Sequence, residues 1–276
     1  MADNNDASMA NNEAEHVPKD LSSAENNGDK SQGHEGSPSP AATPPPTEED
    51  TQELIVVNEH TEELDLNHGR IGKIENLERL KNLQRILDLS FNRIKEIVGL
   101  EKLTSLKKLF LSSNKISEIK NVNHLPKLEL LELGDNRIRI QNVEELTELE
   151  CLVLQSNRIT KIENLEQLSR LEQLYISENG ITVIENLHCQ AKLQTLDLAM
   201  NRITLLENVH CLSELEEFWL NDNQISEWSS VEQLKHNTKL VTIYLERNPL
   251  AADAAYRRKL KLALPSLQQI DATLCR

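Results

Sequence analysis

Nine positions, spaced 21 to 25 residues apart, carry the side chains of this 276-residue chain that are best suited to binding another protein. Four of them are aromatic, out of only eight aromatic residues in the whole chain, four are acidic, and none is Lys or Arg. Exposed aromatic side chains among fixed charges are typical of a binding hot spot. The pattern therefore predicts a protein partner with a basic, partly apolar surface. We call these positions the column; they are Asp65, Asp88, Phe110, Glu132, Val153, Tyr175, Asp197, Trp219 and Tyr244.

Side chains that could perform catalysis or hold a metal form no comparable pattern. No Ser/His/Asp or Cys/His arrangement recurs at a privileged place, and the sequence has no Gly-rich phosphate loop. One metal candidate is the pair of dipeptides His188-Cys189 and His210-Cys211, which lie 22 residues apart and would stack on adjacent turns. Neighbours in sequence generally point in different directions, so these four side chains are not expected to converge. We predict a non-catalytic protein without a metal or another cofactor.

The first 53 residues have a composition of their own. They hold 12 acids and two lysines, and they are rich in Asn, Ser, Pro and Gly with almost no large apolar residues. Such a segment cannot bury enough apolar surface to offset chain entropy, so residues 1–53 are predicted to be a disordered acidic tail. Two interpretations stay open: a solubilising tail, or an arm regulated by phosphorylation at Ser37, Ser39 and Thr43, each of which precedes a proline.

Charge and hydropathy bound the class of partner. The net charge is −15, of which the tail supplies −10 and residues 54–276 only −5. Binding to nucleic acid would require a basic face, so no nucleic-acid partner is expected. No run of 18 apolar residues occurs, and the first twenty residues have neither a basic start nor an apolar stretch. We therefore expect no membrane span and no secretory signal.

A repeat must position the column. From about Leu64 the pattern L-x-x-L-x-L-x-x-N-x-I-x-x-I-x-x-L-x-x-L recurs in nine registers at a spacing close to 22 residues. Within Leu109-Phe110-Leu111 the two leucines should point inward and Phe110 outward, as strand alternation requires. No single repeat can bury its own apolar face, so stability must come from stacking on neighbours. The Asn of each unit should satisfy backbone groups at the bend; it falls at Asn92, Asn114, Asn136, Asn157, Asn179, Asn201, Asn223 and Asn248, with Gly69 in an earlier unit.

This pattern resembles the leucine-rich repeat. The resemblance implies an α/β solenoid, a horseshoe with a parallel sheet on its concave side. The stretch that begins Ile162-Glu163-Asn164-Leu165 is too short for a regular α-helix, so short 3₁₀ turns are expected on the convex side. The cysteines do not form the disulfide-bonded cap of extracellular members, which favours a reducing compartment; they are Cys151, Cys189, Cys211 and Cys275.

The ends of such a solenoid need caps, because an open end exposes apolar surface and a strand edge. We predict a solenoid of about nine repeats over residues 54–250, in which residues 54–63 supply a first strand or turn. Residues 251–276 are predicted to form a C-terminal leucine-rich-repeat cap. There, Tyr256 to Leu264 should form a helix ended by Pro265, followed by a last strand that contains Leu267 and Ile270.

Several longer stretches resemble the leucine-rich-repeat regulatory subunit of type-1 serine/threonine protein phosphatase. They are LKKLFLSSNKIS, LELLELGDNRI, EFWLNDNQISEW, TIYLERNPL and YRRKLKLALPSLQQIDAT. The resemblance implies a scaffold that holds the phosphatase catalytic subunit against its concave face, works in the nucleus and cytoplasm, and can recruit a small disordered phosphatase inhibitor. It implies partner-binding roles for Asp88, Phe110, Glu132, Asp197, Glu217, Trp219 and Tyr244; Tyr175 joins them by its place in the column.

The sequence departs from that family in having fewer repeats. The irregular spacings around Arg85–Leu89 and Arg139–Val143 mark where units could be missing. A shortened arc shifts Trp219 relative to Phe110, which predicts weakened or altered phosphatase binding. The alternative function is another intracellular leucine-rich-repeat adaptor, related to the spliceosomal A-prime subunit or to an axonemal protein, with a different protein partner.

Overall fold

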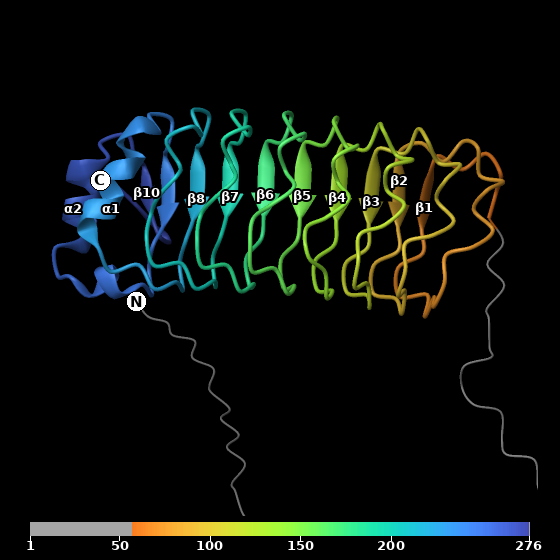
Figure 1. Cartoon of the computed structure of the whole chain (residues 1–276), viewed down its shortest axis with the longest axis horizontal. Coiled ribbons are helices and arrows are strands. Elements are labelled where there is room, and N and C mark those ends of the chain that lie inside the picture. The colour runs from red at the N-terminus through yellow and green to blue at the C-terminus, as the bar shows by residue number, and fades with distance from the viewer. Residues whose placement is uncertain (1–56, 276) are drawn as a thin grey trace, which may run out of the picture. The chain divides into compact units, whose positions relative to one another are not determined.

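Residues 57–275 form one solenoid, seen here in a computed structural model that describes this part of the chain. Successive turns follow one another along the long axis, and their strands lie side by side on one face (Figure 1). Ser37, Ser39 and Thr43, with the rest of the predicted tail, lie outside the described residues. Within 57–275 no helix has both the length and the apolar character needed to cross a membrane.

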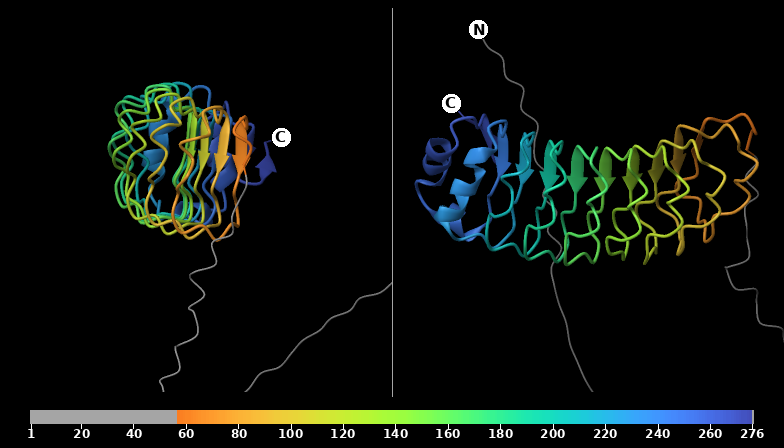
Figure 2. Two further views of the ribbon diagram at one scale, coloured as in Figure 1. Left: turned by 90° about the vertical axis from the view of Figure 1, so that its right-hand side faces the viewer. Right: turned by 45° about the horizontal axis from the view of Figure 1, so that its top comes forward.

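One strand from each repeat joins a single sheet in which all strands follow the order of the sequence. All neighbouring strands are parallel except the last pair, which is antiparallel. The end-on view in Figure 2 shows the strands on one side of the solenoid and the connecting turns on the other. The predicted parallel sheet is confirmed. Its strands are β1 (Glu63–Asp65), β2 (Ile86–Asp88), β3 (Lys108–Phe110), β4 (Leu130–Glu132), β5 (Cys151–Val153), β6 (Gln173–Tyr175), β7 (Thr195–Asp197), β8 (Glu217–Trp219), β9 (Thr242–Tyr244), β10 (Gln269–Ile270) and β11 (Thr273–Leu274).

The strands alternate between the core and the outer face as expected. In β3 the side chain of Leu109 is fully buried, and so is that of Leu111 just after the strand, whereas Phe110 between them is only half-buried. The same pattern places a fully buried Leu, Phe or Ile at the middle of every strand from β2 to β9. The hydrophobic core is therefore continuous along the solenoid, and each repeat adds one layer to it.

The asparagine of each repeat pins the chain where it leaves the strand, as predicted. Asn136 is typical: its Oδ1 accepts the backbone N–H of Ile116 at 2.9 Å. Its Nδ2 donates to the carbonyl oxygens of Leu111, Leu133 and Gly134 at 3.0 to 3.1 Å. Without these hydrogen bonds, each buried backbone group would cost about 1–3 kcal/mol. We call the asparagines at this position of the repeats the first asparagine ladder, and its role is structural.

A second asparagine ladder, which the repeat pattern did not predict, runs along the connecting turns. Asn164 has φ of 61° and donates from Nδ2 to the carbonyl of Ile140 at 2.9 Å. Asparagine tolerates this left-handed conformation better than most residues. Gly99, with φ of 75°, takes the equivalent place in an earlier repeat, where an added Cβ would meet the Ile74 carbonyl at 2.9 Å. The ladder consists of Asn121, Asn142, Asn164, Asn186 and Asn208.

The convex turns make 3₁₀-type hydrogen bonds, mostly as isolated turns. Leu103 N–H donates to Leu100 and Leu106 N–H to Leu103, each three residues back. Between β1 and β9, all within the described residues, continuous helix occurs only in the unit with 25-residue spacing, as α1 (Trp228–Val231) and the 3₁₀ helix η1 (Glu232–His236). The three additional residues of that unit supply the length that a helix needs.

The irregular spacing near Arg85 is absorbed without breaking the sheet. In most repeats one carbonyl accepts two successive N–H groups, as Lys107 does from Glu129 and Leu130. Next to β2, Lys107 and Lys108 instead donate separately to Gln84 and Arg85. The extra residue of this 23-residue unit therefore resides at the entrance to β2, and the pairing of β2 with β3 keeps its register.

A buried carboxylate closes the C-terminal end. Asp271 Oδ1 accepts the N–H groups of Leu245 and Glu246 at 2.9 and 3.0 Å, and the hydroxyl of Tyr256 at 3.1 Å. In earlier repeats the N–H equivalent to that of Leu245 pairs with a carbonyl of the next strand, so Asp271 substitutes for that strand. The predicted cap helix is present as α2 (Tyr256–Ala263), preceded by the 3₁₀ helix η2 (Pro249–Ala252).

Candidate protein-binding face

The strand register brings the predicted partner-binding residues onto one face of the sheet. Seven of the eight are the last residues of their strands, and neighbours such as Asp88 and Phe110 are Cα partners. Glu217 is the first residue of β8 and lies on the same face as Trp219 at its end. The column therefore runs unbroken across the solenoid; its predicted partner-binding members are Asp88, Phe110, Glu132, Tyr175, Asp197, Trp219 and Tyr244.

Three aromatic side chains of the column form one cluster toward the C-terminal end. The ring centroids of Tyr175 and Trp219 are 6.3 Å apart, and those of Trp219 and Tyr244 are 5.8 Å apart, both pairs edge to face. This geometry is favourable for aromatic rings and fixes their positions relative to each other. Phe110 stands apart, because Glu132 and Val153 separate it from Tyr175. The face thus offers a large aromatic anchor and a smaller one.

Asp197 lies beneath this cluster and is not an exposed contact, contrary to the expectation that every column residue faces solvent. Its side chain is only 4% exposed, between Tyr175 and Trp219 on the neighbouring strands. Its Oδ1 accepts the N–H of Ala199 at 2.9 Å. Burial raises the pKa of the carboxyl above its usual value, although hydrogen bonds from Ser177 and Ala199 oppose the shift. The Asp197 carboxyl is therefore covered between the strands that carry Tyr175 and Trp219.

The other acids of the column also have structural partners that the sequence did not reveal. Asp65 and Asp88 each accept a backbone N–H two residues further on, from Asn67 at 3.0 Å and Ser90 at 2.8 Å. The carboxylate of Glu132 accepts the hydroxyl of Ser112. An acid at this position therefore satisfies a polar group on the strand face. Because these hydrogen bonds engage one oxygen of each carboxylate, they leave the other oxygen for a partner.

The indole N–H of Trp219 is buried and has no hydrogen-bond acceptor within residues 57–275. A buried donor without a partner costs about 1–3 kcal/mol and calls for an explanation in a native protein. Tyr244, by contrast, is tied to the cap, since its hydroxyl accepts Gln269 Nε2 at 2.7 Å. Sequence reasoning missed Gln269; its only signal was its place between Leu267 and Ile270 in the predicted last strand, which the structure shortens to β10.

Tyr175 and Cys151 on this face stay uncharged at neutral pH. Burial raises the pKa of Tyr175, and the neighbouring Cys151, Glu217 and Asp197 raise it further. Burial also raises the pKa of the Cys151 thiol to about 11. Both groups therefore stay protonated at neutral pH, so neither is a ready nucleophile or general base. The negative charge of the face belongs to carboxylates, which can attract a basic partner.

The His–Cys dipeptides on the convex turns do not build a metal centre. Cys211 Sγ donates to the Leu187 carbonyl at 3.5 Å, while His188 and His210 are exposed. Across the described chain, no group of three or more His, Cys, Asp or Glu residues comes together in a way that could hold a metal ion. All four cysteines are free thiols.

Comparisons with known proteins agree with the repeat geometry. Residues 148–274 match a leucine-rich-repeat family model, and residues 85–124 match a second model that describes two copies of the repeat. The two segments together cover more than half of the chain. Solved structures are also similar: an internalin of Listeria monocytogenes has 26% identity and a TM-score of 0.68, over 77% of this chain and 61% of its own. A leucine-rich-repeat protein of Leptospira interrogans has 26% identity and a TM-score of 0.65, over 75% and 59%.

Curated relatives match shorter segments. A protein phosphatase 1 regulatory inhibitor subunit homologue of Arabidopsis thaliana is 40% identical over 100 residues, which is 36% of this chain and 30% of the relative. Protein phosphatase 1 regulatory subunit 7 of Xenopus tropicalis is 58% identical over 52 residues, 19% of this chain and 15% of its own. The human protein of that name is 56% identical over 52 residues, 19% and 14%. The matched segments thus span less than a third of each relative.

Relatives named as regulatory subunits and a solenoid of this kind support the prediction of a non-catalytic protein. The chain is a leucine-rich-repeat solenoid, and over part of its length it is similar to regulatory subunits of protein phosphatase 1.

Proposed function

We propose that this protein is a non-catalytic regulatory subunit of type-1 serine/threonine protein phosphatase. It binds the catalytic subunit through the concave strand face and modulates its activity or targeting. The observation that carries this proposal is the edge-to-face cluster of Tyr175, Trp219 and Tyr244 among carboxylates. The relatives named above supply the identity of the partner.

The aromatic cluster is organised as an anchor for a partner. Trp219 lies at its centre, and its half-buried ring is held by Tyr175 on one side and Tyr244 on the other. Pre-positioned rings lose little conformational entropy on binding. A carbonyl oxygen of the partner that accepts the unpaired indole N–H would also remove the cost of that buried donor. Both effects favour binding at Trp219.

The acids add electrostatic selectivity for a basic surface. Glu217 lies two residues before Trp219, and Glu132 and Asp88 flank Phe110 on its two neighbouring strands. Asp197 is buried, so it offers the partner no exposed carboxylate. Complementary charge raises the association rate and discourages acidic surfaces from binding. The proposed contact surface therefore combines two aromatic anchors with intervening carboxylates.

The alternative, a spliceosomal or axonemal adaptor, is less favoured because the relatives above are named as phosphatase regulatory subunits. A small disordered inhibitor as a third component, and a nuclear and cytoplasmic location, remain predictions from the family resemblance.

Direct binding tests the proposal. Isothermal titration of the purified protein with the type-1 catalytic subunit should give saturable binding, whereas the catalytic subunit of a different serine/threonine phosphatase should give none. Human protein phosphatase 1 regulatory subunit 7 serves as a reference, and the shorter arc predicts a weaker affinity than that reference shows. Absence of binding to the type-1 enzyme would refute the proposed function, whereas equal affinity of the two proteins would refute only the weakening.

A further inference from the structure

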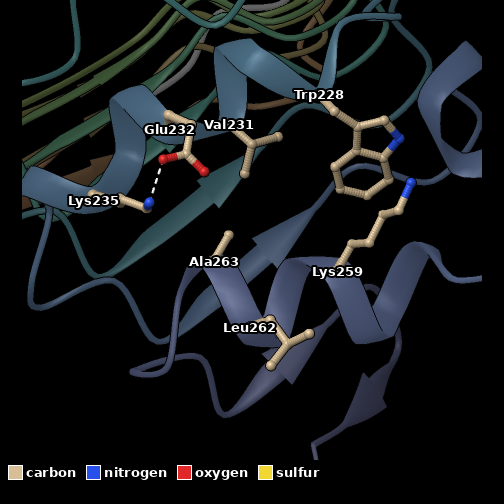
Figure 3. A pocket seen from close by; sticks show the side chains of 7 residues that line it. All are labelled: Trp228, Val231, Glu232, Lys235, Lys259, Leu262 and Ala263. Carbon is tan, nitrogen blue, oxygen red and sulfur yellow. Dashed lines mark ion pairs between the residues drawn. The ribbon is translucent and has the colours of Figure 1, made fainter.

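A groove lies between α1–η1 and α2 at the C-terminal end of the solenoid (Figure 3). Its volume is about 360 Å³, which can accept one or two apolar side chains. Val231 and Ala263 point into it from opposite sides, and Trp228 and Lys259 lie at one end. Its lining contains no residue of any strand. The groove is therefore a separate surface from the column.

The rim of the groove combines apolar and cationic groups. Leu262, which lines the groove from α2, is 71% exposed and can be reached by a partner. Lys259 Nζ lies 4.9 Å from the centroid of the Trp228 ring and pairs with Asp253. At the opposite end Lys235 pairs with Glu232. Both lysines are half-exposed, so an incoming carboxylate can reach them.

The charge of this end is opposite to that of the rest of the chain. Residues 228–276 contain eight Lys and Arg against four Asp and Glu, although the whole chain has a net charge of −15. Arg258, one turn before Leu262 on α2, adds an exposed cation beside the groove. The groove itself is lined by two lysines against one acid, Glu232, together with four apolar residues, so it favours a partner segment that is both acidic and apolar.

We infer that this groove is a second docking site, for an acidic segment of a partner protein that inserts apolar side chains between α1–η1 and α2. The apolar side chains contact Trp228, Leu262 and Ala263, while its carboxylates pair with Lys235, Lys259 and Arg258. A segment of this kind docks by the groove mode in which an amphipathic peptide buries its apolar face. The site leaves the column free, so both surfaces can be occupied together.

The chain carries its own reporter for this site. It has two tryptophans, and Trp219→Phe leaves Trp228 in the groove as the sole indole. Titration of this variant with a synthetic peptide that carries Glu and Leu at helical spacing should give a saturable change in Trp228 fluorescence. Matched peptides with Lys in place of every Glu, or Ser in place of every Leu, should bind at least about tenfold more weakly.

Two substitutions place the binding in the groove. Lys235→Glu combined with Leu262→Ser, both at exposed positions, should weaken the Glu/Leu peptide at least about tenfold. Lys239→Glu is the matched control, because Lys239 is equally exposed and pairs with Glu214 outside the groove; it should change affinity by less than about twofold. The inference is wrong if no saturable signal appears, if the Lys peptide or phosphatidylserine vesicles bind as strongly, or if Lys239→Glu weakens binding as much as the double substitution.

Discussion

The ring of Tyr175 meets the ring of Trp219 at a centroid distance of 6.3 Å across strand β7, whose own column residue is the smaller Asp197. Because the Asp197 side chain is small, the two larger rings on the neighbouring strands can contact each other. The Asp197 side chain is buried between them. The contact joins β6, β8 and, through Tyr244, β9 into one surface. Binding energy on this face is therefore expected to concentrate at the C-terminal third of the solenoid.

The buried carboxyl of Asp197 should give stability a specific pH dependence. Its pKa is raised in the folded protein, so the folded state binds more protons than the unfolded state between the ordinary value of 3.8 and the raised value. Stability from this group is therefore present at low pH and is lost as pH rises through the folded pKa. Relative to Asp197→Asn, whose amide oxygen can still accept Ala199 N–H, the wild type should become less stable as pH rises from 3.5 to 7. Urea unfolding across that range measures the difference, and a difference that does not change with pH would contradict it.

The carboxylate of Asp271 should contribute more to the free energy of unfolding than any exposed ion pair does. Asp271→Ala leaves two backbone N–H groups and the Tyr256 hydroxyl without their acceptor, and should lower the free energy of unfolding by about 2–4 kcal/mol. Asp271→Asn keeps an acceptor and should cost less. Glu214→Ala, which removes an exposed pair with Lys239, should cost less than about 1 kcal/mol. If Asp271→Ala unfolds in urea like Glu214→Ala, the carboxylate does not close the sheet.

Substitutions at Asn164 can separate the two contributions of the second asparagine ladder to stability, namely the hydrogen bond and the tolerance of positive φ. Asn164→Gly keeps the positive φ accessible and removes only the hydrogen bond to Ile140, whereas Asn164→Ala also introduces backbone strain. Thermal and urea unfolding should therefore rank wild type above the Gly variant and the Gly variant above the Ala variant. The free energy of unfolding of the Ala variant should be about 1 kcal/mol below that of the Gly variant. An Ala variant as stable as the Gly variant would show that the left-handed conformation carries no cost there.

Salt should weaken phosphatase binding if the carboxylates of the face contribute as proposed. Raising ionic strength from about 0.05 to about 0.5 M screens charge pairs at the rim of an interface, so the affinity should fall several-fold, mainly through the association rate. Glu217→Gln should reduce this salt dependence, whereas Glu145→Gln, an acid on a convex turn, should not. Stopped-flow association rates test both variants, and an association rate insensitive to salt would leave the acids without a role in binding.

The repeat made much of this structure accessible from sequence. A spacing near 22 residues predicts the strands, the buried Leu109 and Leu111, and the first asparagine ladder, because each repeat must solve the same packing problem. The residues of the column were identified by the same periodicity. The periodicity did not predict how exposed each of these residues is, because the burial of Asp197 depends on the size of its neighbours on β6 and β8. Periodicity reports which face a residue occupies and leaves open what covers it.

Features that occur once were the hardest to foresee. Asp271 closes the sheet from a position with no equivalent in the repeats, and Gln269 reaches Tyr244 only because the cap folds back beside β9. The groove beside Trp228 likewise depends on how α2 packs near α1. Such contacts join segments by tertiary packing, for which a repeat pattern holds no local signal.

The most direct test of the account replaces the aromatic at the centre of the face. Trp219→Ala should weaken binding of the type-1 phosphatase catalytic subunit by about 2 kcal/mol or more, roughly thirtyfold, with unfolding still cooperative. Phe91→Asn is the matched control, because Phe91 is an exposed aromatic outside the column with φ of 56°, which asparagine tolerates; it should leave the affinity unchanged. Isothermal titration of both folded variants decides the matter: loss with Trp219→Ala alone supports binding through the column, and wild-type affinity for Trp219→Ala would contradict it.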